Sequence, residues 1–279
     1  MVTAAPSQQY PIEKVEMVFK DIFKFSRVFS TFPIDNEYSD ISKFNIAKGI
    51  VLYLLADIFG FELLYRFSIH ENFIMGGKIV FALQTIPAIM FYWIHIAWLI
   101  RNKSLFKELY DELKDIEHIL WESGICWFYK PAWCTKYLSL TAMIISGTLW
   151  DILDDILNPE EQLYNMIFIA LISVINQYAI LVQVMLSILR EIRTIEESET
   201  VIKLTDKLLA VCQKVNTFYE PQIFFYIVIV YLLILSTIYG MAIEVETLSL
   251  ISSIWLLSFV SPLIHIIICV DYFSHEVIL

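Results

Sequence analysis

Charged residues are scarce in this sequence of 279 amino acids: Asp, Glu, Lys and Arg together make up 18 %, against roughly 25 % in an ordinary soluble domain. Four cysteines are too few for a disulfide scaffold. The net charge of -11 comes without any cluster of basic residues. That balance excludes a nucleic-acid partner, because phosphate binding requires a concentrated positive surface.

Catalytic motifs are lacking as well. The sequence contains no GxSxG, HExxH, GxxxxGK[ST], GxGxxG or CxxC pattern. His95 and His265 each stand alone within apolar stretches, which favours histidines that pack between helices over metal ligands. The pair His275–Glu276 is too small for a zinc site. We therefore expect no enzyme, no cofactor and no metal.

Apolar residues are abundant instead. Hydrophobic residues make up 58 % of the chain, aromatic residues make up 15 %, and the mean hydropathy is +0.66. One core cannot bury so much apolar surface, so the excess must face lipid. We predict an all-α, polytopic membrane protein, because a helix of about 20 apolar residues crosses the hydrocarbon layer and satisfies its own backbone. Six segments of that length occur, at about 46–65, 79–100, 133–153, 166–189, 223–241 and 248–270.

The basic residues predict the orientation, because cytoplasmic loops retain Lys and Arg. With the amino terminus inside, only Arg66 and Lys78 of the 19 basic residues fall outside. All four cysteines (Cys126, Cys134, Cys212 and Cys269) then lie at cytoplasmic levels and should be free thiols. We treat 1–279 as a single membrane domain with a cytoplasmic amino-terminal segment, 1–45.

Two cytoplasmic segments, 101–131 and 190–220, carry apolar residues at helical spacing. The first stripe contains Leu105, Leu109, Leu113, Ile116 and Leu120; the second contains Leu204, Leu208, Cys212, Val215 and Phe218. One interpretation is a pair of amphipathic helices on the membrane surface. The interpretation that we favour is that the membrane helices continue into the cytoplasm and pack against one another there.

Polar and aromatic side chains within the outer halves of the predicted spans are candidate ligand contacts. Asp57 is the deepest acid, and an acid inside a span costs about 2.5–3.5 kcal/mol on insertion scales. A ligand pocket would account for the set Asp57, Glu62, Gln84, Trp150, Tyr164, Tyr239 and Trp255. The alternatives are a structural hydrogen bond for Asp57, a contact with lipid headgroups for Glu62, and an interfacial aromatic belt for the other five. Asp151, Asp154 and Asp155 form either an outer acidic vestibule that attracts cations or a solvated helix end.

Three segments resemble the insect gustatory receptors, members of the seven-transmembrane insect chemoreceptor superfamily. They are FKFSRVFSTFPI near the amino terminus, LLAVCQKVNTFYEPQIFFYIVIVYLLILSTIYG leading into the fifth predicted span, and CVDYFSHEVIL after the sixth. The resemblance implies a ligand-gated cation channel subunit in the plasma membrane of a sensory neuron. It also implies a small-molecule tastant as ligand, and a homo- or hetero-tetramer as the assembly.

The family's clearest signature, Thr-Tyr followed by Gln-Phe in a seventh span that lines the pore, does not occur before Leu279. We therefore expect this chain to lack the seventh helix. Two alternatives stay open: an odorant receptor of the same superfamily, and a polytopic transporter. Pro87 and Pro262 fall inside predicted spans, as transporters with broken helices require, but they form no obvious repeat.

Overall fold

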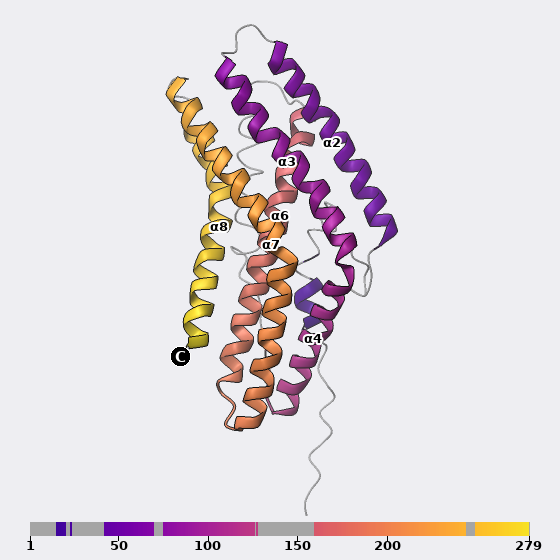
Figure 1. Cartoon of the computed structure of the whole chain (residues 1–279), viewed down its shortest axis with the longest axis vertical. Coiled ribbons are helices and arrows are strands. Elements are labelled where there is room, and N and C mark those ends of the chain that lie inside the picture. Colours follow the sequence, from indigo (N-terminus) through magenta and orange to yellow (C-terminus); the bar gives the residue numbers. More distant parts are fainter. Residues whose placement is uncertain are drawn as a thin grey trace, which may run out of the picture.

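A computed structural model describes residues 15–20, 23, 42–69, 75–125, 127, 159–243 and 249–278. Of these residues 94 % are helical, and the described part of the chain contains no strand. The predicted all-helical class is therefore confirmed for that part. Figure 1 shows the longest helices lying lengthwise. The elements are α2 (Lys43–Ile69), α3 (Met75–Arg101), α4 (Lys103–Glu122), α6 (Pro159–Ile192), α7 (Ser198–Ile243) and α8 (Ser249–Ile278).

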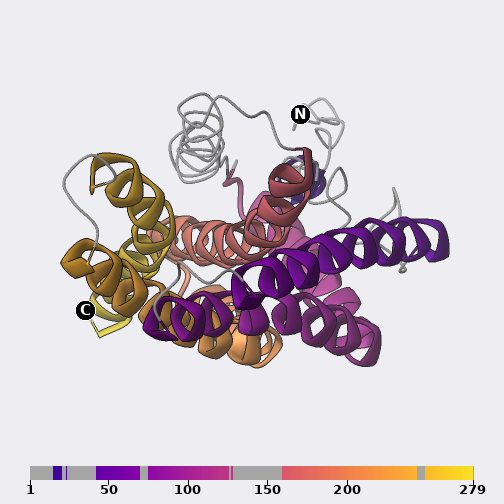
Figure 2. The same cartoon turned by 90° about the horizontal axis from the view of Figure 1, so that it is seen from above.

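Helix α6 lies at the centre and packs against α2, α3, α7 and α8. Seen from above, in Figure 2, it runs between α8 on one side and the α2–α3 pair on the other. In its most apolar stretch 89 % of the residues are buried, whereas the corresponding values are 39 % for α7 and 28 % for α8. The outer helices therefore present much of their apolar surface to the surroundings.

Three of the described helices are long and apolar enough to cross a membrane: 167–192 within α6, 198–239 within α7 and 256–276 within α8. They overlap the fourth, fifth and sixth predicted spans. The first predicted span lies within α2 and the second within α3. The apolar part of α3, Thr85–Arg101, is shorter than the three stretches just named. The third, 133–153, lies outside the described residues. A total of six spans and the side of each terminus stay predictions.

The apolar stripes predicted on the two segments between spans face each other across the contact between α4 and α7. Leu109, Leu113, Ile116 and Leu120 of α4 are buried, as are Leu204, Leu208, Val215 and Phe218 of α7. Helix α7 joins its stripe and its apolar run in one helix of 46 residues. At 1.5 Å per residue it is about 69 Å long, more than twice the thickness of the hydrocarbon layer.

The entry into α4 differs from a smooth continuation of α3, because Asn102 interrupts the helix. Its backbone N–H still donates to the carbonyl of Trp98 (2.9 Å), and its side-chain Nδ2 donates to the same carbonyl (3.0 Å). Residues 15–20 pack on α4, where Phe19 contacts Tyr110 at a ring separation of 5.0 Å. The backbone N–H of Val15 donates to the buried carboxylate of Glu117 (3.0 Å).

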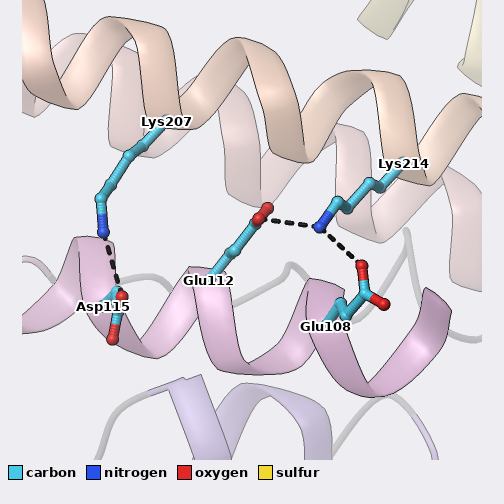
Figure 3. Close-up of polar contacts among 5 residues, drawn as sticks. All are labelled: Glu108, Glu112, Asp115, Lys207 and Lys214. Atoms are coloured by element: carbon cyan, nitrogen blue, oxygen red, sulfur yellow. Dashed lines mark hydrogen bonds and ion pairs between the residues drawn. The ribbon is translucent and has the colours of Figure 1, made fainter. Parts of the chain in front are cut away.

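Charged side chains cover the outer edge of the contact between α4 and α7 (Figure 3). The ammonium of Lys214 donates to Glu112 Oε1 (2.8 Å) and Glu108 Oε2 (2.9 Å), and Lys207 donates to Asp115 Oδ2 (3.0 Å). Glu112, followed by Glu108, raises the pKa of Lys214 by hydrogen bonding to its charged form. This part of the molecule is built like a soluble protein, with an apolar interior and an ionic rim.

Candidate functional site: buried polar groups among the helices

Asp57 on α2 is buried, with 7 % of its surface exposed, although its helix turns an apolar face outward. The indole N–H of Trp93 on α3 donates to its Oδ2 atom at 2.6 Å. The Oδ1 atom is also buried, and it accepts no hydrogen bond from the residues that the structure describes. A buried carboxylate with one open oxygen is costly unless another donor or a cation completes it. Asp57 is therefore a candidate contact for a bound group.

Two tyrosines lie beside this carboxylate. The ring of Tyr53, one turn before Asp57 on α2, stacks on the ring of Tyr92 with centroids 3.4 Å apart. Tyr92 is 1 % exposed, and within the described structure its hydroxyl has no hydrogen-bond partner. Tyr53, Asp57, Tyr92 and Trp93 make up what we call the α2–α3 cluster. It combines aromatic faces with two buried oxygens, which is the composition of sites that bind small polar or cationic groups.

A second set of contacts joins α3 to α7 through His95 and Trp98, two and five residues along from Trp93. His95 is buried and lies 3.5 Å from Gln222 Nε2 through its Nδ1 atom. The indole N–H of Trp98 donates to the backbone carbonyl of Phe218 (2.9 Å). Pro221 lies inside α7 and supplies no N–H to the preceding turn, which weakens the backbone ladder at this level. The contacts between α3 and α7 therefore lie at the level where Pro221 interrupts the backbone hydrogen bonds of α7.

Polar side chains also follow one face of the central helix α6. At 100° per residue, Ser173, Asn176, Gln183 and Ser187 share this face. Gln183 contacts His265 Nε2 of α8 at 2.6 Å, and Trp127 donates to Ser187 Oγ at 2.9 Å. Such hydrogen bonds hold helices together where the surrounding medium is apolar. Sequence inspection for ionisable groups missed this α6 stripe, although polar residues recurring at three- and four-residue spacing within an apolar span would have revealed it.

The isolated histidines of the sequence each have a glutamine partner, His95 with Gln222 and His265 with Gln183. Over the described ranges, no group of three or more His, Cys, Asp or Glu side chains is arranged to hold a metal ion. The glutamine contacts agree with the interpretation of these two histidines as residues that pack between helices.

The structure describes the side chains of three predicted site residues, Asp57, Glu62 and Tyr239. Asp57 pairs with Trp93, and Glu62 binds Arg66 on the next turn of α2 (2.6 Å). Tyr239 lies near the far end of α7, half-buried. Within the described structure, no hydrogen bond, ion pair or ring contact joins any two of these three residues. A pocket that contains all of them therefore stays a prediction.

For three other candidates the structure gives the helix in which each residue lies. Gln84, Tyr164 and Trp255 are helical residues of α3, α6 and α8. Trp150 and the predicted acidic vestibule, Asp151, Asp154 and Asp155, lie outside the described residues.

Comparison of the chain with protein-family models, with curated proteins and with solved structures finds no match.

Proposed function

We propose that the chain is a gustatory receptor subunit of the plasma membrane. In this proposal it binds a small-molecule tastant and contributes to a ligand-gated cation channel, as part of a homo- or hetero-tetramer in a sensory neuron. The resemblance of three sequence segments supports this class of function. The distribution of basic residues supports an amino terminus on the cytoplasmic side.

The observation that carries the proposal is the buried carboxyl of Asp57 with its open oxygen. An ionisable residue buried inside an apolar helical bundle is expensive, and it is therefore by default a functional residue. In the proposed mechanism the ligand completes the α2–α3 cluster by donating a hydrogen bond, or a positive charge, to Asp57 Oδ1. Occupancy shifts α3 through Trp93, and the shift reaches α7 through the Trp98–Phe218 hydrogen bond beside Pro221.

The test is electrical recording from cells that express the chain together with candidate partner subunits, while sugars, amino acids and bitter compounds are applied. We expect a ligand-evoked cation current and a shift of its dose–response curve in Asp57→Asn. Asp271→Asn is the matched control, because Asp271 is an exposed acid on α8, far along the sequence from the cluster. Surface labelling of each variant separates altered gating from lost expression.

A transporter is the second candidate, favoured by prolines inside α3 and α8 (Pro87 and Pro262). The same cells distinguish the two classes. Saturable uptake of a solute without ligand-evoked conductance would assign the chain to transport and overturn the receptor proposal. Currents evoked by volatile compounds alone would point to the odorant receptors instead.

A further inference from the structure

Five basic residues gather where the apolar parts of α2 and α3 end. Lys43 and Lys48 lie in the first two turns of α2, Arg101 ends α3, and Lys103 and Lys107 begin α4; all five are exposed. We call this set the basic belt. The stretches that contain it, 43–56 and 75–107, include no Asp or Glu, and the acids that directly follow them are engaged elsewhere: Asp57 binds Trp93 and Glu108 pairs with Lys214. The belt is therefore a local concentration of positive charge on a chain whose net charge is -11.

The packing of α2 against α3 places the two halves of the belt at one level. Figure 1 shows α2 and α3 side by side and running in opposite directions, and the contacts of Tyr53 with Tyr92 and of Asp57 with Trp93 set their register. If this register is extended toward the start of α2 and the end of α3, Lys48 and Arg101 lie at about the same height along the two helices. In Figure 1 the lower end of α2 lies at about the height at which α3 passes into α4.

An exposed apolar stripe leads to the belt on each helix. On α2 the stripe contains Val51, Leu54, Ile58 and Phe61, and on α3 it contains Ile79, Leu83, Ile86, Met90 and Ile100. Each stripe continues into a basic residue, Lys48 on α2 and Arg101 on α3. Apolar side chains that end in a ring of positive charge match the cross-section of one lipid leaflet, in which acyl chains end in headgroups.

We propose that the basic belt binds the headgroups of anionic phospholipids in the leaflet at this end of α2 and α3. The headgroup phosphate supplies the negative charge, and the acyl chains lie along the adjacent apolar stripes. A lipid fits better than a free anion because the charge and the apolar surface are contiguous. The proposal depends on the placement of the chain in a membrane but not on the identity of the tastant.

The test measures lipid binding to the purified chain in neutral detergent. Phosphatidylglycerol and phosphatidylcholine with identical acyl chains are added at equal concentration, and bound lipids are counted by native mass spectrometry. The test variant is Arg101→Gln/Lys107→Gln. The control, Arg66→Gln/Lys203→Gln, removes the same two charge types at exposed positions outside the belt. Circular dichroism establishes that both variants retain their helices.

We expect the wild-type chain to prefer phosphatidylglycerol. A basic residue near an anionic surface contributes about fivefold in affinity, so the test variant should lose about 25-fold and the control should change by no more than about twofold. Raising the ionic strength should weaken the preference, because exposed charges are screened.

Four results would overturn the proposal: no preference in the wild-type chain, equal losses in the two variants, displacement of the lipid by the same concentration of inorganic phosphate, or a change of oligomeric mass in the test variant. The third result would assign the belt to a free anion and the fourth to a second copy of the chain. None of these readouts involves a tastant, so the outcome is independent of the receptor proposal. A wild-type chain that fails to partition into membranes would instead contradict the membrane placement itself.

Discussion

The α2–α3 pair and the α4–α7 contact are built in opposite ways. On α2 the outward residues are apolar, such as Leu54 and Ile58, and the buried side includes the carboxyl of Asp57. On α4 the outward residues are charged, such as Glu108 and Asp115. Its buried side is mostly apolar, although it also includes the carboxyl of Glu117, which accepts a hydrogen bond from Val15. The difference indicates two solvents, because each surface matches the medium in which exposing it costs least.

Helix α7 belongs to both regions. Between 198 and 220 its Lys207 and Lys214 form ion pairs with α4, whereas further along the exposed side chains are Phe224, Tyr231 and Ile238. A helix about 69 Å long cannot lie wholly within a hydrocarbon layer about 30 Å thick. The change in its exposed residues therefore marks the level at which one medium gives way to the other.

The largest effect is expected at the contact between α4 and α7. Leu113→Ala removes a fully buried side chain between α4 and α7, and it should lower the free energy of unfolding by about 2–5 kcal/mol through lost burial and the cavity left behind. Leu209→Ala on the exposed side of α7 is the control and should have a small effect. Denaturant unfolding of both variants in detergent measures the difference. Equal losses would contradict an apolar interior at this contact.

The second prediction compares the outward surfaces of the two regions. Ile58→Asp places a charge on the outward face of α2, where 59 % of the side chain is exposed, and it should reduce membrane insertion by about 2.5–3.5 kcal/mol. Lys203→Asp on the exposed face of α7, at a position outside the basic belt, should change insertion by no more than about 0.5 kcal/mol. A glycosylation-based insertion assay compares the two. If Ile58→Asp inserted as well as the wild-type chain, the outward face of α2 would not be facing lipid.

The third prediction concerns the polar interior. Trp93→Phe removes the N–H donor from Asp57 and leaves both of its oxygens without a donor, which should cost about 1–3 kcal/mol of stability. In the Asp57→Leu background the same change should cost much less, since the acceptor is then absent. A double-mutant cycle on thermal unfolding measures the coupling. Additive losses would show that the 2.6 Å hydrogen bond contributes nothing.

The smallest effect is expected at the ionic rim. Lys214→Gln should cost about 0.2–1 kcal/mol, because its pairs with Glu112 and Glu108 lie at the partly exposed edge of the contact. The two carboxylates raise the pKa of Lys214 above the ordinary 10.5, so its contribution is fully present below that pH and is lost as the pH rises through the higher folded-state pKa. Unfolding curves at neutral and strongly alkaline pH measure this loss. A contribution of Lys214 to stability that increased at alkaline pH would contradict the predicted direction of this pH dependence.

Much of the helical framework could be predicted from the sequence, because helical periodicity places Leu109, Leu113 and Ile116 on one face whatever they contact. Asp57 was recognisable as an acid in an apolar run. Its partner Trp93 was not, since a contact across 36 residues depends on the register between two helices. The contact between Gln183 and His265, 82 residues apart, escaped prediction for the same reason. No proline or glycine lies near Asn102, so the sequence does not predict the interruption of the helix there.

The most direct test of the two-solvent account is a spin-label scan along the exposed face of α7 in lipid bilayers. Single cysteines at Ile202, Leu209, Thr217, Phe224, Tyr231 and Ile238, in a background without the native cysteines, would carry the label. The account predicts access to a water-soluble relaxant at 202 and 209 and access to oxygen at 224, 231 and 238, with the change between 217 and 224. Uniform accessibility along the helix would contradict it.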